Sequence, residues 1–393
     1  DRDLPIRALL LRVSADAHIL LVTVHHIAAD AWSLAMVTHE VATIYNALAN
    51  EVEGAGMPSG DEPETLLPAL PVQYRDFAVW QRQWLQGALL EREIGYWKQR
   101  LGSTPPQLML PTDHARPERQ SYRGGRLAFH LSGEILEPLR RLSRRQGVTL
   151  FMTLLAAFKL LLSKFSGQTD ILVGTDVANR NRAETEQLVG FFVNLLPLRT
   201  DLSGNPSFVQ LLGRVRETAL GAYAHQDVPF EKIVDSLKLT RDLGRNPLVQ
   251  VLFVLQNVPP PSLQLAGVNV ESLEFEHEVS RFDVGLFMEE TEDGCAGLWK
   301  FSRDLFESQT IAGWTQRFLR LLQQIGLSPE CGIETLEMDD AEVKEARRMD
   351  TKQRNDERLQ RFKAIKPKPV ALAQRTLVSG RPLVDGRPMP WLY

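Results

Sequence analysis

The feature that most constrains the fold is an apolar run at residues 248–255, interrupted only by Gln250. A strand with one face in water alternates apolar and polar residues, whereas a strand covered on both faces does not. The run therefore predicts a central strand of a sheet. Shorter apolar or alternating stretches predict further strands at residues 8–13, 18–24, 126–131, 170–175, 282–288 and 296–301.

Helices are predicted where apolar residues recur at spacings of three and four and so form one stripe. Thr149 stands where its hydroxyl can cap such a helix. The pattern predicts helices at residues 34–48, 74–100, 150–165 and 311–325, and another that begins near residue 208. The helix at 74–100 carries three tryptophans.

Proline-rich residues 104–117 interrupt these patterns and predict a linker between two lobes. The tail is poor in apolar residues, and between Lys344 and Lys368 it holds ten Lys or Arg against four Asp or Glu. That composition predicts a basic linker or arm rather than core. We therefore divide the chain into a first lobe at 1–103, a linker at 104–121, a second lobe at 122–338 and a tail at 339–393.

Composition excludes several classes of protein. The chain has 393 residues, of which 44% are hydrophobic and 24% charged, so it can build a core and is not broadly disordered. A net charge of −4 gives no global attraction to nucleic acid or to an anionic membrane. No apolar run reaches the roughly 20 residues of a membrane-spanning helix. Two cysteines offer neither a disulfide framework nor a metal quartet. With no signal peptide and no initiator Met, we expect a fragment of a cytoplasmic protein.

The segment from His25 to Ser33 carries the clearest chemical signal. An apolar strand delivers two histidines to its end, small residues form a tight turn, and a helix then begins. The turn can bring the carboxylate of Asp30 back beneath the end of the strand. Histidine side chains have an unperturbed pKa of about 6.5, so a neutral imidazole placed there can accept a proton or orient a nucleophile.

Three other interpretations compete with a catalytic one. Adjacent residues of a strand point to opposite faces, so at most one histidine faces a given site and the other is a core residue. A zinc site would need a third ligand, and His18 and His39 have no supporting pattern. Asp30 can also be a helix cap, a role that is compatible with a buried ion pair.

The string His-His-Ile-x-x-Asp-x-Trp-Ser resembles the central motif of condensation domains of nonribosomal peptide synthetases. The resemblance continues in the family's order along the chain. Matching stretches occur at residues 74–81 (YRDFAVWQ), 121–124 (SYRG), 149–152 (TLFM), 189–199 (VGFFVNLLPLR), 225–231 (HQDVPFE) and 241–250 (RDLGRNPLVQ). So many ordered matches over residues 7–340 make a chance resemblance negligible.

The resemblance implies an α/β (α+β) fold of two lobes that look like chloramphenicol acetyltransferase and form a pseudo-dimer, with a tunnel between them. Donor and acceptor peptidyl carrier proteins would bring an acyl and an aminoacyl group to the two mouths, each as a thioester on phosphopantetheine. The acceptor amine would attack the donor thioester and form an amide. The domain itself would bind no cofactor or metal, and adenylation domains would be further partners.

By position, the resemblance makes His26 the active-site histidine, either as a base or as a group that positions the amine. A free α-amine has a pKa near 8, so a neutral imidazole would help to select the reactive neutral amine. Asn194 and Gln250 are expected either to border the tunnel or to make hydrogen bonds within sheet and loops. The other motif residues are expected to be structural: His25, Asp30, Ala31, Trp32 and Ser33.

The chain departs from the family in two respects. The family has a further segment before the central motif, near the arginine that pairs with the motif's aspartate. We therefore expect an incomplete first lobe, an Asp30 carboxylate without its partner and an isolated chain that is inactive. In addition, Ala31 stands where glycine is commonest, and its methyl group is tolerated if the backbone φ is negative.

The tail carries a second, shorter resemblance. Residues 361–370, followed by Leu377 and Val378, look like the start of taurine-dioxygenase-like iron hydroxylases. If so, the parent protein joins a condensation-like domain to an oxygenase whose iron ligands lie beyond Tyr393. The alternative is a generic basic linker.

Three functions remain open. The first is an amide-forming transferase that acts on carrier-bound substrates, which the intact His26 favours. The second is a non-catalytic module that docks a carrier protein and an iron/2-oxoglutarate hydroxylase, which the tail favours. The third is a related acyl-CoA transferase or epimerising domain. The segments at 74–81, 189–199 and 225–231 favour an ordinary elongating domain, and we expect an L-donor and an L-acceptor. Neighbouring adenylation domains would set the amino acids.

Overall fold

The computed structural model describes residues 4–52, 66–240, 242–256, 263–273 and 279–339, and two short strands near the C-terminus. The chain separates into two units, Asp1–Met338 and Asp339–Tyr393. In the second unit, β9 (Leu383–Val384) pairs antiparallel with β10 (Arg387–Pro388). The basic stretch and the oxygenase-like stretch of the tail lie outside the described residues.

The first unit begins with a β-hairpin followed by a long helix. β1 (Ile6–Arg12) pairs antiparallel with β2 (His18–Val24), and α1 (Ala31–Val52) follows. These elements confirm the predicted strands and helix. Apolar side chains on both faces of the hairpin are exposed, because a two-stranded ribbon cannot cover its own faces. They are Ile6, Leu9, Leu10, Leu11, Leu20, Leu21 and Val22.

The prediction of one helix over 74–100 is wrong, because the chain forms two. α2 (Tyr74–Trp84) ends at Leu85, and α3 (Gly87–Leu101) begins two residues later. Gly87 has φ +55, a left-handed conformation that glycine adopts without a steric penalty. The break lets the two helices take different directions.

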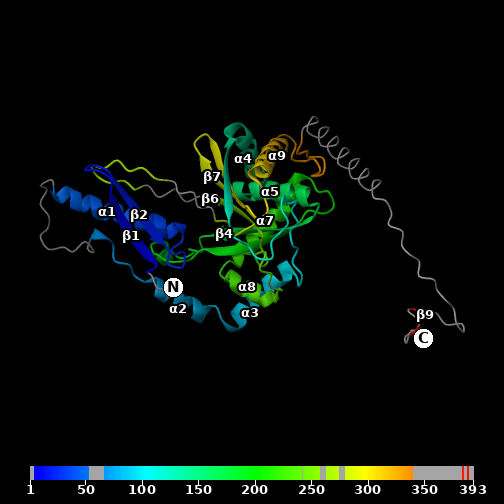
Figure 1. The fold of residues 1–393 in the computed structure, drawn as a ribbon, viewed down its shortest axis with the longest axis horizontal. Coiled ribbons are helices and arrows are strands. Elements are labelled where there is room, and N and C mark those ends of the chain that lie inside the picture. The colour runs from blue at the N-terminus through cyan, green and yellow to red at the C-terminus, as the bar shows by residue number, and fades with distance from the viewer. Residues whose placement is uncertain are drawn as a thin grey trace. The chain divides into compact units, whose positions relative to one another are not determined.

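The second lobe is built on a six-stranded mixed sheet with strand order β3-β8-β7-β6-β4-β5. The strands are β3 (Gly124–Ser132), β4 (Asp170–Val177), β5 (Asn194–Asp201), β6 (Val251–Gln256), β7 (Val284–Thr291) and β8 (Gly294–Ser302). β6 is an interior strand and runs parallel to both neighbours, β4 and β7 (Figure 1). Val251 and Phe253 are fully buried, so the predicted central strand is confirmed.

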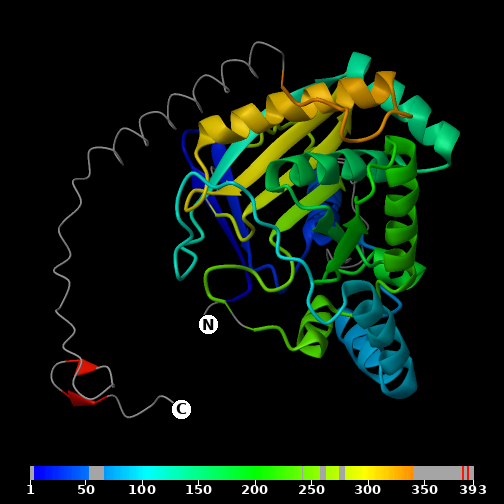
Figure 2. The same cartoon turned by 90° about the vertical axis from the view of Figure 1, so that its right-hand side faces the viewer.

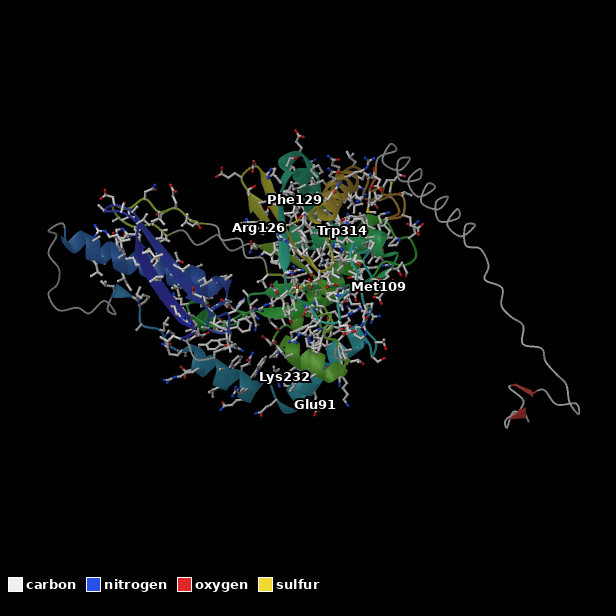
Figure 3. All side chains as sticks on the ribbon, viewed as in Figure 1. Glu91, Met109, Arg126, Phe129, Lys232 and Trp314 are labelled. Atoms are coloured by element: carbon white, nitrogen blue, oxygen red, sulfur yellow. The ribbon has the colours of Figure 1, made fainter. Side chains whose placement is uncertain are left out.

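Helices cover one face of this sheet (Figure 2). They are α4 (Gly133–Gln146), α5 (Leu150–Ser166), α7 (Phe208–Ala224) and α9 (Ser308–Leu327). α5 contacts α7 and α9, and α4 contacts α9, so the four form one layer. The hydroxyl of Thr149 accepts a hydrogen bond from the Met152 N–H at 3.2 Å, which confirms the predicted cap of α5. Trp314 of α9 points into the shared core (Figure 3).

The lobe also has two shorter helices, α6 (Ala183–Glu186) and α8 (Phe230–Leu237), and α8 contacts β5. Among the described residues, no single helix is long and apolar enough to cross a membrane. Only α4 and α5 taken together meet that test of length and composition, and they meet at a bend of 111°. Most of α5 is buried in the core of the second lobe.

Candidate active site

The hairpin ends at the two predicted histidines. β2 stops at Val24, and the His25 N–H donates to the Pro5 carbonyl at 2.7 Å, which holds the strand end against β1. The His25 carbonyl then accepts from the Ala28 N–H at 2.9 Å and closes a turn. The His25 Nδ1 accepts from the Ile27 N–H at 3.1 Å. His25 therefore stabilises the turn that displays its neighbour.

The turn fixes the tautomer of His26. Its Nδ1 lies 3.1 Å from the Ala29 carbonyl oxygen. A carbonyl oxygen can only accept, so Nδ1 carries the hydrogen and Nε2 of the neutral ring keeps a free lone pair. The ring is exposed, and it packs edge-on against Phe191 with centroids 5.2 Å apart. The arrangement holds one imidazole with Nε2 ready to accept a proton or a hydrogen bond from a substrate.

Asp30 lies beneath the turn and is paired, contrary to expectation. Its Oδ1 is 3.2 Å from a terminal nitrogen of Arg180, and both side chains are almost completely buried. The arginine follows β4 in the second lobe and does not come from a segment before the motif. The resemblance identified the type of partner, but its expected position was wrong because the pairing crosses 150 residues.

The Asp30 carboxylate also caps α1. Its Oδ1 accepts from the backbone N–H and the hydroxyl of Ser33, each at 2.8 Å, and its Oδ2 accepts from the Phe192 N–H at 3.0 Å. Burial alone would raise the pKa of Asp30, but these hydrogen bonds and the charge of Arg180 hold it below its ordinary value. Asp30 therefore remains ionised at neutral pH. Capping and ion pairing coexist in one residue.

The other motif residues attach the same loop to the second lobe. The Ser33 hydroxyl lies 2.8 Å from the Gly190 carbonyl oxygen and 3.0 Å from its N–H. The Trp32 indole N–H donates to the Glu186 carbonyl at 2.9 Å. Ala31 is the first residue of α1 and is not among the described residues with positive φ, so its methyl group is accommodated.

Arg180 is held by more than its charge partner. Its guanidinium donates to the carbonyls of Thr185 and Leu188, and it lies 4.1 Å from the ring centroid of Phe192. Arg180 was not predicted as a site residue. The one available signal was a buried-type strand at 170–175 followed closely by an arginine.

The segment 190–192 packs closely against α2. The Tyr74 hydroxyl donates to the Phe191 carbonyl at 2.9 Å. A methyl group added to Gly190 would lie 2.1 Å from the Tyr74 ring, so only glycine fits here. Two stretches that carry the resemblance, 74–81 and 189–199, therefore meet in space beside His26.

Asn194 and Gln250 are both buried within the second lobe. The Asn194 amide nitrogen donates to the carbonyls of Gln226 and Val228 at 2.7 and 2.8 Å, and its oxygen accepts from the Phe230 N–H at 3.0 Å. The Gln250 amide donates to the Asn246 carbonyl at 3.1 Å. Of the two predicted alternatives, these contacts favour hydrogen bonding within sheet and loops.

No group of three His, Cys, Asp or Glu side chains that could hold a metal ion occurs in the described ranges. His18 and His39 lie on β2 and α1 and form no such group with His25 or His26. The site as described consists of one accessible imidazole on a loop that a buried ion pair fastens to the second lobe.

Comparison with known families agrees with this geometry. A model of the condensation domain matches residues 1–346. The chain belongs to the condensation domain family. Among curated proteins, this condensation domain is 44% identical over 337 residues to one of the linear gramicidin synthase subunits of Brevibacillus parabrevis, a match over 85% of this chain and 6% of that protein. One of the plipastatin synthase subunits of Bacillus subtilis (strain 168) is 38% identical over 327 residues, 83% of this chain and 12% of that protein. The chain spans a small part of each relative.

Solved structures confirm the fold. The crystal structure of the X-domain from teicoplanin biosynthesis matches with a TM-score of 0.78 at 30% identity, over 86% of this chain and 75% of that one. A complex of that X-domain with OxyB matches with a TM-score of 0.77 at 30% identity, over 86% and 74% of the two chains. The condensation domain of the Monacolin K polyketide synthase MokA shares the fold, with a TM-score of 0.68 at 19% identity over 84% and 74%. The predicted α/β, chloramphenicol-acetyltransferase-like fold is thereby confirmed.

Proposed function

We propose that this condensation domain forms amide bonds between carrier-bound acyl or aminoacyl thioesters in nonribosomal peptide synthesis. The observation that carries the proposal is the imidazole of His26. Its Nδ1–H is committed to the Ala29 carbonyl, so Nε2 is left to accept from a substrate. The likeness to proteins of linear gramicidin and plipastatin synthesis supports the same reaction class.

In this reaction the neutral α-amine of the acceptor attacks the carbonyl carbon of the donor thioester. The C–N bond forms, the C–S bond breaks, and the thiolate leaves on the donor's phosphopantetheine arm. The nitrogen loses one proton, and the departing thiolate finally takes one up. Nε2 of His26 either carries that proton or holds the amine by a hydrogen bond, and both roles need the tautomer that Ala29 imposes. The domain's partners in this scheme are donor and acceptor carrier proteins and adenylation domains.

The buried pair Asp30–Arg180 helps to hold the imidazole of His26 in place. It fastens the His26 turn and the helix that follows to the end of β4, so the imidazole has one position relative to the second lobe. We infer that Asn194 and Gln250 do not contact the substrate and instead hold loops of the second lobe by hydrogen bonds.

A second candidate function follows from one comparison. The X-domain that this chain resembles has been solved in complex with OxyB. By analogy, this domain would dock a carrier protein and recruit an oxygenase without forming bonds. The accessible Nε2 of His26 has no purpose in that scheme, so we place it second.

The test uses the full-length parent protein with donor and acceptor carriers loaded. We expect His26→Ala to lower the rate of dipeptidyl-carrier formation by about 100-fold or more, because it removes the group that takes the proton or holds the amine. Mass spectrometry of the carriers measures the product, and thermal unfolding checks the fold. His18→Ala, an exposed histidine on the same hairpin, is the matched control and leaves the rate unchanged. Undiminished product in the His26 variant would overturn the catalytic proposal and favour docking.

A further inference from the structure

A second carboxylate, Asp176, interacts electrostatically with His26. Asp176 is the seventh residue of β4, four residues before Arg180. His26 stands four residues before Asp30, and the Asp30–Arg180 pair joins the two segments. The ion pair thus brings the end of β4 to the His26 turn.

The register of the sheet shows which way Asp176 points. The hydroxyl of Thr200 on β5 accepts from Lys159 of α5 at 2.7 Å, so Thr200 faces the helical layer. Its partner on β4 is Ile171, and directly paired residues share a face. Side chains alternate along a strand, so Thr175 also faces α5 while Asp176 points to the opposite face. Their burial agrees, because Thr175 is 2% exposed whereas Asp176 is open to solvent.

The charges of Asp176 and His26 act on each other. The surrounding protein raises the pKa of Asp176 to about 6, although water reaches the side chain, and the charge of His26 opposes that shift. Among the described residues, His26 is the cation whose charge acts on the pKa of Asp176. The neighbouring carboxylates differ, since Asp30 pairs with Arg180 and Asp227 interacts with Asn181 and Arg182. Asp176 is therefore an exposed carboxylate with no described ion pair to Lys or Arg.

We propose that Asp176 binds the α-ammonium group of the acceptor substrate beside His26. The proposal rests on the proposed function, which supplies an acceptor with a free α-amine. Such an amine has a pKa near 8 and is mostly protonated at neutral pH. Asp176 gains a charge-assisted hydrogen bond from the ammonium group, and no such gain exists for an acceptor without nitrogen. Asp176 thus selects amine-bearing acceptors. The bound ammonium group releases one proton to solvent, and the neutral amine then attacks as in the proposed reaction.

Direct binding tests this without any bond formation. The probes are the alanyl amide of aminopantetheine, a stable stand-in for the acceptor thioester, and the propionyl amide, which lacks only the α-amino group. Calorimetry on the full-length parent is expected to show about tenfold tighter binding of the alanyl probe by the wild type. Asp176→Asn is expected to abolish that preference, and Asp176→Glu, which keeps the charge, to retain part of it. Asp201→Asn changes a carboxylate at the far end of the paired strand and is expected to leave the preference intact.

The experiment tests amine binding by Asp176 separately from amide formation by the domain. Equal binding of the two probes by the wild type, or a preference that survives in Asp176→Asn, overturns the role of Asp176. Neither result depends on amide formation. His26→Ala is expected to keep the preference while losing product, so a domain that forms no amide can still support the Asp176 site. Circular dichroism of each variant confirms that the fold is retained.

Discussion

At the scale of single residues, the most informative position is Arg180, because it gives a buried carboxylate its only described charge partner. The pair joins residues that are 150 positions apart and lies in the interior, where an isolated charge is costly. Its hydrogen bonds to Thr185 and Leu188 and its contact with Phe192 leave the guanidinium in one position. The rigidity of the His26 turn therefore depends on a residue of the second lobe.

We expect Arg180→Met to lower the free energy of unfolding by about 3–5 kcal/mol, because the Asp30 carboxylate is then buried without its partner. Urea denaturation at pH 7 measures the change. The double variant Asp30→Asn with Arg180→Met is expected to lose less than the sum of the two single changes, since neither charge then remains. Arg144→Met is the matched control, an exposed arginine of α4 whose surface pair contributes less than about 1 kcal/mol. A loss in Arg180→Met no larger than in Arg144→Met would contradict the expectation.

At the scale of elements, the α5–β5 contact contains an unusual residue. Lys159 of α5 is completely buried, and its Nζ donates to the Leu198 carbonyl and to the Thr200 hydroxyl, each at 2.7 Å. Burial lowers the pKa of this amine to about 7, against the opposing charge of Asp170. The helix and the edge strand are thus joined by an amine that changes its charge near neutral pH.

Proton binding by Lys159 links the free energy of unfolding to pH. The unfolded chain has a lysine pKa of about 10.4, so between pH 7 and 10 it binds more protons than the folded chain. This lysine therefore makes the fold more stable as pH rises from about 7 to about 10, by roughly 3–5 kcal/mol. We subtract the free energy of unfolding of Lys159→Met from that of the wild type. This difference is expected to become more positive by that amount over this range, as measured by urea denaturation. Lys232→Met, on the surface of α8, is expected to show no such slope. A flat difference for Lys159→Met would refute the interpretation.

Element boundaries show where sequence patterns succeed and fail. The central strand β6 and the core helix α5 have long apolar patterns and were predicted. α4 was missed, although Leu136, Leu139 and Leu142 form a buried stripe, because Pro138 and four arginines interrupt its apolar pattern. The break between α2 and α3 was missed because no proline marks it. Such breaks depend on a single residue, Gly87, and leave no periodic signal.

At the scale of the whole molecule, the hairpin leaves many of its apolar side chains exposed. Its cross-strand partners Leu10 and Leu20 are 64% and 47% exposed, and apolar side chains lie on both faces. In the described residues the hairpin sheet has two strands only, so each strand has an open edge. Apolar faces and open edges together favour pairing with another chain.

Expressed by itself, the 393-residue chain is therefore expected to associate with a second copy through β1 and β2. The double change Leu10→Thr and Leu20→Thr keeps strand propensity while removing apolar surface, and it is expected to weaken self-association by about tenfold or more. Sedimentation velocity over a range of concentrations measures this. Leu327→Thr, at the exposed end of α9, is the control for removal of an equally open leucine elsewhere. If both variants associate like the wild type, the hairpin is not the contact surface.

The sequence by itself determined the condensation-domain family, the central strand and the strand–turn–helix that displays His26. These depend on neighbours along the chain: apolar periodicity, small turn residues and an aspartate three positions before Ser33. Only the tertiary structure decided that Arg180 pairs with Asp30, that the charge of His26 acts on Asp176 and that Asn194 forms hydrogen bonds with the loop at 226–230. Each of these contacts joins segments distant in the chain. Their energies come from burial and from charges brought together by folding, and these leave no local pattern to read.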